Sequence, residues 1–223
     1  MARRALSVTV VTFTATAALL LAGCGGGWGG GDSSAGDIKG AGSGAGSASP
    51  SASASASAAS QVTRPVITLP SSFQLTFESW TSSDAKEQAV LDDAKEELRA
   101  GYAAIIANDP DSEALAFYDT ENGRSQSSRW IKSYTDKNVT VIGKLPAFDP
   151  KVTLVDSGDG RTASLRYCTD ESKAYTKNRK TGAVVGNPEG TAPEVGYLVT
   201  LRKSAQGVWQ NDSVTAKRGE CAQ

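Results

Sequence analysis

Residues 25–60 are almost entirely glycine, alanine and serine, and this run decides how much of the chain can fold. A segment of this composition cannot bury enough apolar surface to offset the entropy lost on ordering. We therefore interpret it as a disordered tether with a mean end-to-end distance of roughly 30–36 Å. Folding is left to residues 62–223, a length that can bury a core without a metal or a disulfide scaffold.

Residues 1–23 have the pattern of an export signal. Arg3 and Arg4 precede an uncharged stretch over 5–21, as in the positive and apolar regions of a signal peptide. The stretch is rich in threonine and shorter than the ~20 apolar residues that a permanent membrane-spanning helix requires. We predict that the segment directs export and is then removed; the alternatives are an uncleaved signal anchor or a free cysteine at Cys24.

The signal ends in the sequence LAGC at 21–24, which resembles the lipobox of bacterial lipoproteins. The resemblance implies that the thiol of Cys24 carries diacylglycerol and that the peptide is cut just before it. Two acyl chains hold a protein stably to a bilayer, at ~0.8 kcal/mol per buried methylene. We therefore predict a secreted, lipid-anchored (palmitate-bearing) envelope protein on the outer face of the cytoplasmic membrane, with 24–61 as its lipidated tether.

The composition excludes several classes of function. The chain has no histidine, which rules out serine–histidine and cysteine–histidine hydrolases and histidine-ligated zinc. Its formal net charge of −1 gives no electrostatic footprint for nucleic acid. No motif indicates a metal or a cofactor, so we predict neither. Any acid–base chemistry falls to Asp, Glu, Lys or Tyr.

The clearest structural element is a helix from Asp84 to Asn108. Asp84 is placed to cap it, with Glu87 three residues later as in a capping box. Apolar residues recur at helical spacing on one side, and charged residues cover the other. The apolar stripe consists of Leu91, Ala94, Leu98, Tyr102 and Ile105, and the charged side of Asp92, Asp93, Lys95, Glu96, Glu97 and Arg99.

The rest of the pattern indicates two shorter helices and a series of strands. The helices are expected over 112–118 and 125–136, and the second is expected to bury Trp130, Ile131 and Tyr134. Strands are expected over 73–77, 139–141, 152–154, 163–167, 172–179, 195–201 and 208–215. Apolar and polar residues alternate, as in half-buried strands, over 73–77, 163–167 and 195–201, whereas the strand over 172–179 is polar. Helices followed by an antiparallel meander predict an α+β domain, with the helices on one face of a curved sheet.

Four short sequences carry a resemblance to a known fold family: LP at 69–70, LTF at 75–77, YCTD at 167–170 and GVW at 207–209. With the order of the elements, they are similar to nuclear-transport-factor-like and ketosteroid-isomerase-like proteins over roughly 66–221. More narrowly, the chain resembles a group of cell-surface lipoproteins of high-GC Gram-positive (actinobacterial) bacteria without assigned activity. The resemblance implies a cone-shaped domain, and that fold hosts enzymes, binders and scaffolds alike.

Two cysteines remain once Cys24 is acylated. Cys168 and Cys221 lie in a compartment that permits disulfides, and an even pair is best interpreted as one. Closing a loop of this length gives ~4 kcal/mol in the chain-entropy model. The alternative is a redox-active pair, which usually has the C-x-x-C spacing that this pair lacks.

Acidic residues supply the other candidate sites. Asp156 and Asp159 lie in a glycine-rich stretch whose spacing lacks the alternating ligands of a calcium loop, so a plain turn is expected. Asp170 and Glu171 follow Cys168 closely. They are placed either as a base or ligand contact at the mouth of the cone, or in a solvated bulge.

Aromatic and basic residues leave further alternatives open. The aromatic residues that either line an inner cavity or pack as core are Tyr102, Trp130, Tyr134, Tyr167 and Tyr197. A basic stretch either meets an anionic wall polymer or forms a solvated face; it consists of Lys173, Lys177, Arg179 and Lys180.

No reactive cluster stands out, so we predict a noncatalytic lipoprotein. Its expected partners are the membrane, through the lipid, and an envelope protein, a wall polymer or a small apolar ligand. The alternative is an enzyme that works in the cone cavity, with Asp170 as the base and Tyr197 as a hydrogen-bond donor. A third alternative is a structural spacer or a homodimer module.

Overall fold

The computed structural model of the chain describes residues 62–155 and 160–221. Within this part, no helix is long and apolar enough to cross a membrane. Four predictions lie outside the described residues: the signal peptide over 1–23, the lipid on Cys24, the tether over 24–61, and the turn or calcium site at Asp156 and Asp159.

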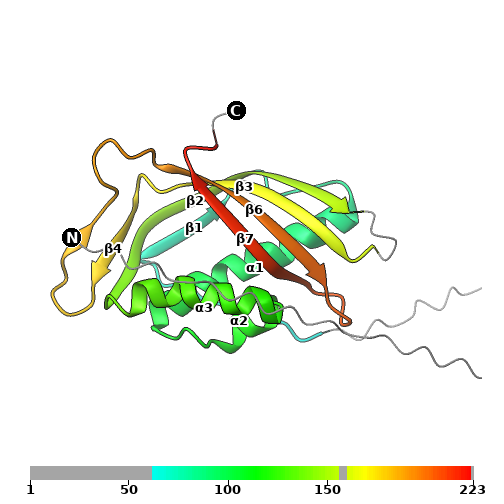
Figure 1. The fold of residues 1–223 in the computed structure, drawn as a ribbon, viewed down its shortest axis with the longest axis horizontal. Coiled ribbons are helices and arrows are strands. Elements are labelled where there is room, and N and C mark those ends of the chain that lie inside the picture. The colour runs from blue at the N-terminus through cyan, green and yellow to red at the C-terminus, as the bar shows by residue number, and fades with distance from the viewer. Residues whose placement is uncertain (1–61, 156–159, 222–223) are drawn as a thin grey trace, which may run out of the picture. The chain divides into compact units, whose positions relative to one another are not determined.

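One sheet and three helices make up the described part of the chain (Figure 1). In chain order the elements are β1 (Phe73–Phe77), α1 (Ala85–Ala107), α2 (Glu113–Tyr118), α3 (Glu121–Thr135), β2 (Val139–Val155), β3 (Thr162–Asp170), β4 (Ala174–Asn178), β5 (Val184–Val185), β6 (Glu194–Lys203) and β7 (Trp209–Arg218). The strands run in the order β5-β4-β2-β3-β6-β7 with antiparallel pairing, and β1 adds to β2 in parallel.

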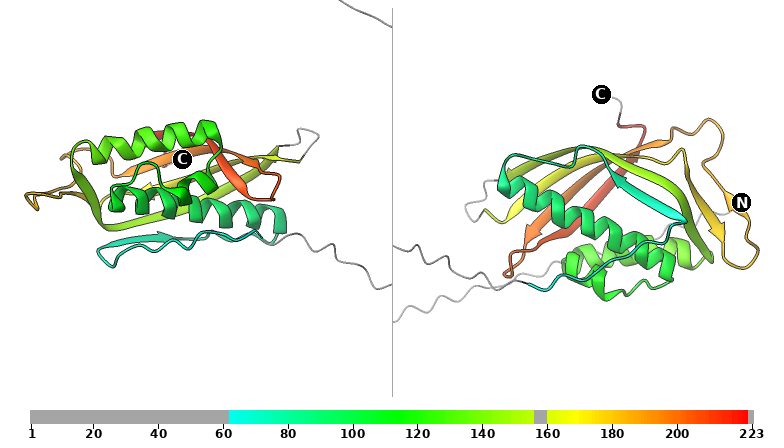
Figure 2. Two further views of the ribbon diagram at one scale, coloured as in Figure 1. Left: turned by 90° about the horizontal axis from the view of Figure 1, so that it is seen from below. Right: turned by 180° about the vertical axis from the view of Figure 1, so that it is seen from behind.

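The helices and the sheet form two layers. The sheet curls, and the helices lie along its inner side, with α2 and α3 beneath β7 (Figures 1 and 2). This is the α+β cone that the sequence predicts. The arrangement leaves a partly open cavity between α1, α3 and the strands β3, β6 and β7, where the candidate site lies.

Strand β2 is a single strand of 17 residues where the sequence predicts two, at 139–141 and 152–154. The strand bends instead of turning: its pairing with β3 shifts register between Phe148 and Lys151, and Asp149 has a φ of 51°. The first half pairs with β4 and β1, and the second with β3. The prediction of two strands is wrong because a bulge breaks the alternation of side chains without ending the strand.

Helix α1 has the predicted ends. The Asp84 carboxylate accepts hydrogen bonds from the backbone N–H groups of Lys86 and Glu87, and Asn108 closes the helix with a φ of 61°. The capping box differs in detail, because the Glu87 carboxylate accepts a hydrogen bond of 2.7 Å from the Ser82 hydroxyl. The Ser82 oxygen accepts in turn from the N–H of Asp84 at 3.1 Å, so the hydroxyl lies between the two expected partners.

Helix α3 begins at Glu121, earlier than the predicted start at residue 125. The Thr120 hydroxyl accepts a hydrogen bond of 3.1 Å from the N–H of Gly123. Gly123 is required there, because an added Cβ would lie 2.0 Å from the carbonyl oxygen of Asn211 on β7. The same carbonyl accepts from the N–H of Thr120 at 2.9 Å, so the start of α3 is fixed to the last strand.

Two clusters of buried apolar side chains fill the space between the layers. One is centred on Phe73, Ile105, Leu115, Ile131 and Leu145, and the other on Trp80, Leu91, Leu165, Leu201 and Trp209. The predicted burial on α3 is confirmed for Ile131 and wrong for Trp130, which is 36% exposed. Tyr134 is half-buried.

A charged contact joins the segment before β1 to the rest of the domain. Arg64 donates from Nε and Nη2 to one carboxylate oxygen of Asp93, at 3.1 and 2.7 Å. The other oxygen accepts from the backbone N–H of Trp209 at 2.8 Å. Asp93 was expected on the solvent side of α1, but it is 2% exposed. The expectation is wrong because α1 is packed on more than its apolar stripe.

The predicted disulfide is confirmed. Cys168 and Cys221 are bonded, with their Cα atoms 5.8 Å apart. The bond holds the C-terminal tail against β6, where an added Cβ on Gly196 would lie 3.4 Å from the Cβ of Glu220. Since Cys168 lies between Tyr167 and Thr169 on β3, the disulfide also fixes the strand that forms part of the cavity wall.

Candidate functional site

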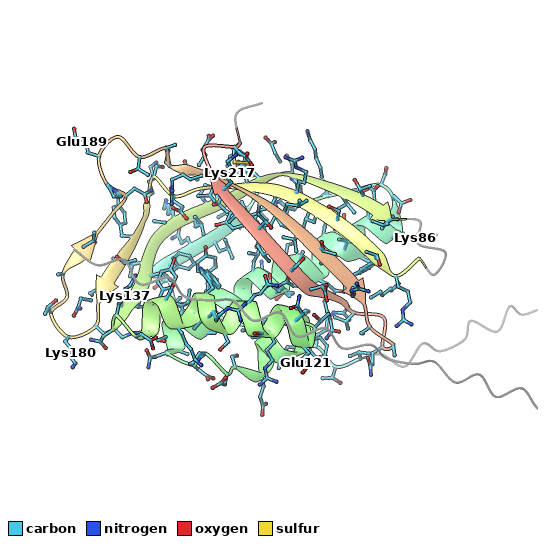
Figure 3. All side chains as sticks on the ribbon, viewed as in Figure 1. Lys86, Glu121, Lys137, Lys180, Glu189 and Lys217 are labelled. Atoms are coloured by element: carbon cyan, nitrogen blue, oxygen red, sulfur yellow. A yellow bond between two sulfur atoms is a disulfide. The ribbon has the colours of Figure 1, made fainter. Side chains whose placement is uncertain are left out.

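A cavity of about 380 Å³, here called the aromatic cavity, lies between α1 and α3 on one side and β3, β6 and β7 on the other. Figure 3 shows side chains from both layers directed into the space between them. The aromatic cavity is lined by Tyr102, Trp130, Tyr167 and Tyr197, by the polar residues Glu97, Gln126, Ser127, Arg129 and Thr169, and by Leu98, Val214 and Ala216. Volumes of this order are typical of small-molecule sites.

The register of β3 and β6 builds the sheet wall of the aromatic cavity. Tyr167 lies opposite Tyr197, and their rings stack with centroids 4.8 Å apart and planes 5° apart. Thr169 is on the same face as Tyr167, because alternate residues of a strand point to the same side. The sequence left open whether these tyrosines line a cavity or pack as core, and the structure places both at the cavity.

The helix wall depends on a close approach between α1 and α3. An added Cβ on Gly101 would lie 2.8 Å from the ring of Trp130, so any larger residue would displace this ring. The Trp130 ring contacts Tyr102 edge to face, with centroids 5.3 Å apart and planes at 87°. Both rings line the aromatic cavity, so the partial exposure of Trp130 has a structural reason.

Glu97 supplies a carboxyl group to the aromatic cavity. Burial raises its pKa well above the usual range, and the nearby carboxyl of Asp119 raises it further. Within the described residues, the Glu97 carboxyl makes no hydrogen bond and no ion pair. The Glu97 residue is half-buried, and a carboxyl group that is partly withdrawn from water and has no cationic partner favours its protonated form.

A second carboxyl group lies behind the wall. Asp119 is 4% exposed, and burial raises its pKa to about 6. Its Oδ1 accepts a hydrogen bond of 3.0 Å from the Asn211 amide, whereas Oδ2 has no hydrogen-bond partner. The hydroxyl of Ser127, which lines the aromatic cavity, lies beside this carboxyl and lowers its pKa. Glu97 and Asp119 interact, and like charges at such a site oppose full ionisation of both.

The hydroxyl groups of the wall stay neutral near pH 7. Burial raises the pKa of Tyr102 and Tyr167 well above the usual range, and that of Tyr197 to about 12. The Thr169 hydroxyl lies near that of Tyr197, but its oxygen makes no hydrogen bond of normal geometry, and the residue is 2% exposed. The cavity therefore holds polar atoms that are short of partners.

The predicted site residues divide between the cavity and its surroundings. Tyr197 lines the aromatic cavity, but Asp170 does not: its carboxylate accepts from the N–H of Ser172 at 2.8 Å in a tight turn. Glu171 forms an ion pair with Arg218. The structure thus separates Asp170 from Tyr197 and brings Glu97 to the site instead.

The ion pair of Glu171 and Arg218 borders a second, smaller cavity of about 220 Å³. Tyr134 lines this second cavity, and Tyr102 borders both cavities. Four of the five aromatic residues considered from the sequence thus line the aromatic cavity, and Tyr134 lies next to it.

The residues of the basic stretch have different surroundings. The Arg179 guanidinium donates to the carbonyl oxygens of Ile105 and Ile106 and so closes the C-terminal end of α1. Lys173, Lys177 and Lys180 are exposed, and Lys180 projects from the tip of the β4–β5 turn (Figure 3). Within residues 62–155 and 160–221, no group of three or more cysteine and acidic side chains is placed to hold a metal ion.

Sequence reasoning missed Glu97 and Asp119. Glu97 was counted on the solvent side of α1, yet it lies one turn after Asp93 and one turn before Gly101, in a row that borders the apolar stripe. A glycine inside a long helix indicates that another segment packs closely against the helix there. The row that contains Gly101 could therefore have been predicted to face the interior. Nothing in the sequence around Asp119 distinguishes it from a helix-ending residue.

Comparisons with known proteins give likenesses of fold. No family model matches the chain, and no curated protein matches it. A ketosteroid isomerase-like protein from Erwinia carotovora atroseptica is 19% identical, with a TM-score of 0.41, over 59% of this chain and 95% of that one. ActVI-ORFA from Streptomyces coelicolor is 12% identical, with a TM-score of 0.40, over 59% and 93%. Aln2 from another Streptomyces species is 14% identical, with a TM-score of 0.40, over 56% and 88%.

Proposed function

We propose that the protein is a lipid-anchored envelope protein that binds a small, largely apolar organic ligand in the aromatic cavity. The ligand places one polar group at Glu97. The observation that carries this proposal is the Glu97 carboxyl, which lines the cavity, has a pKa raised by burial and has no partner among the described residues.

An unpaired carboxyl group in an apolar wall costs free energy in the folded protein, because burial without a hydrogen bond is unfavourable. Folding alone gives no reason to keep it, since an apolar side chain of similar volume would pack there at lower cost. A ligand that supplies the missing partner removes this cost. The aromatic rings supply the apolar contact area that such a ligand needs.

The location of the protein at the membrane is part of the same proposal. Support comes from the LAGC sequence at 21–24, the uncharged stretch before it and the glycine- and serine-rich run after it. Cys24→Ala should release the protein from the membrane fraction and abolish fatty-acid labelling. An unchanged distribution with unchanged label would overturn the anchoring, but it would leave the ligand site standing.

The ligand site is tested by blocking its rim. Ala216 lies on β7 at the rim of the aromatic cavity, where it is exposed, and the neighbouring Thr215 is exposed on the other face of the strand. We expect Ala216→Trp to abolish binding of small apolar ligands, measured by calorimetry on the full chain in detergent. Thr215→Trp is the matched control and should bind as the unchanged protein does. Equal binding by all three proteins would place any ligand elsewhere.

A second candidate function is acid–base catalysis in the same cavity. Two carboxyl groups, Glu97 and Asp119, have raised pKa values, and such groups at one site suit a general acid and a general base. Tyr197 stays a hydrogen-bond donor in this scheme, and the base moves from Asp170 to the buried pair. Catalysis would be supported by a reaction rate that depends on a group titrating near pH 6 and is lost in Asp119→Asn. A reaction rate that does not change with pH would argue against catalysis by this pair.

A further inference from the structure

The charge of the ligand follows from the groups around the aromatic cavity, if the proposed binding function holds. Glu97 lines the cavity and Asp119 lies behind it, so two carboxyl groups act on its interior. A buried acid is normally paired with a cation or neutralised. Within the described residues, neither Glu97 nor Asp119 forms an ion pair.

The basic residues near the cavity do not fill this role. Arg129 is at the cavity rim on α3, but it is exposed and its guanidinium donates to the Ser125 hydroxyl at 2.7 Å. Arg124, also on α3, is exposed and acts on Asp119 from a distance. The titratable groups that face Glu97 from the sheet, Tyr167 and Tyr197, are neutral hydroxyls. In the part of the chain that the structure describes, neither Arg129 nor Arg124 forms an ion pair with Glu97 or Asp119.

The unpartnered buried polar atoms at the cavity are also of one kind. The Oδ2 of Asp119 and the Oγ1 of Thr169 are oxygen atoms without hydrogen-bond partners, and Thr169 is 2% exposed and lines the cavity. Carboxylate oxygens accept hydrogen bonds, and a threonine hydroxyl can accept as well as donate. Once the carboxyl groups are ionised they repel an anionic ligand, whereas a cation or an N–H donor is stabilised by them and by the free acceptor capacity of Thr169.

The aromatic rings favour the same ligand. Tyr102, Trp130, Tyr167 and Tyr197 line the cavity together with the carboxyl of Glu97. The faces of such rings attract an organic cation that lies within ~6 Å of the ring centre, and cages of aromatic residues bind quaternary ammonium groups in this way. A stripped metal ion would not suit these walls, because the rings offer no ligand atoms.

We propose that the aromatic cavity binds an organic cation, an ammonium group with small apolar substituents, and that Glu97 is its counter-ion. The cation binds the ionised carboxylate of Glu97. When Glu97 is protonated, it must lose its proton for the cation to bind. Affinity therefore rises with pH. Asp119 strengthens the negative potential without contacting the ligand, and the aromatic rings hold the substituents.

The test uses matched pairs of probes on the full chain in detergent. Choline and benzyltrimethylammonium are titrated by calorimetry, each against a neutral compound in which carbon replaces the ammonium nitrogen; for choline this is 3,3-dimethylbutan-1-ol. We expect the cation of each pair to bind at least tenfold more tightly at pH 8, with an affinity that falls as the pH is lowered to 5. Trp130 fluorescence should report the same binding, because its ring lines the cavity.

Two variants on α1 complete the design. Glu97→Gln should weaken cation binding at least tenfold, reduce its pH dependence to the part that Asp119 contributes, and leave the neutral compounds unaffected. Glu96→Gln is the matched control, because Glu96 pairs with Arg99 and does not line the cavity. If the cation and the neutral compound bind equally well, and both lose binding in Ala216→Trp, the proposal of a cationic ligand is overturned. The proposed binding of small apolar ligands would then still stand. Failure of every probe and of a wider panel of apolar ligands to bind would overturn both.

Discussion

Two acidic side chains one turn apart on α1, Asp93 and Glu97, have opposite surroundings. Asp93 is 2% exposed, and its two oxygens accept hydrogen bonds from Arg64 and from the backbone of Trp209. Glu97 lines the aromatic cavity and has no partner among the described residues. A fold that needs a buried acid for stability surrounds it with donors. The unpaired acid is therefore the one that indicates binding.

The two ends of the layer interface are also held in different ways. At the Trp80 end, the Trp80 indole donates to the carbonyl oxygen of Ala147 at 3.1 Å, beside an open pocket of about 410 Å³. At the cavity end, the disulfide from Cys168 lies behind the sheet wall. One end is thus held by a hydrogen bond and the other by a covalent bond.

The largest expected effect comes from that covalent bond. Replacing both Cys168 and Cys221 by alanine should lower the free energy of unfolding by about 4 kcal/mol, because the cross-link restricts the unfolded chain. Ligand affinity should fall as well, since Tyr167 and Thr169 flank Cys168 in the wall. Urea unfolding followed by tryptophan fluorescence measures the first effect, with Cys24→Ala as the control. If the free energy of unfolding does not decrease, the disulfide does not stabilise the cavity end.

The next effect tests the paired acid. Asp93→Ala should lower the free energy of unfolding by about 3 kcal/mol, because it leaves the buried N–H of Trp209 without an acceptor and Arg64 without its carboxylate. Arg64→Ala should cost less, since the arginine side chain is 47% exposed and Asp93 keeps its hydrogen bond from the backbone of Trp209. If the two variants lose the same free energy of unfolding, Asp93 stabilises the protein through its ion pair with Arg64 and not through its contact with the backbone of Trp209.

Sequence patterns predicted the parts of this comparison that depend on periodicity. The strands, the ends of α1 and the disulfide followed from alternation, capping residues and an even cysteine pair. The roles of Asp93 and Glu97 did not, because their neighbours Arg64, Trp209 and Trp130 approach from distant segments. The register shift of β2 and the pairing of buried charges are tertiary properties that no local pattern carries.

The third effect is a pH dependence at the cavity end. Burial raises the pKa of Asp119 from its ordinary 3.8 to about 6, so the folded protein holds this proton more tightly than the unfolded chain. Its contribution to stability, about 2–3 kcal/mol, is fully present below about pH 4 and is lost as the pH rises to about 6. Asp119→Asn keeps the acceptor for Asn211 and should flatten stability over this range in urea unfolding from pH 4 to 7. Asp170→Asn, in the exposed turn, should keep the slope; a slope unchanged in both variants contradicts the assignment.

The smallest effect on stability belongs to Glu97, and it decides the comparison. The raised pKa of Glu97 means that its contribution to stability is present at low pH and lost as the pH rises toward the folded value. Glutamine has nearly the same shape and carries no proton to lose, so Glu97→Gln should change the free energy of unfolding by less than about 1 kcal/mol at pH 7 and stabilise the protein at pH 8. Chemical unfolding at the two pH values measures this. A loss as large as that of Asp93→Ala would mean that Glu97 has a structural partner, and the unpaired acid would then no longer mark a binding site.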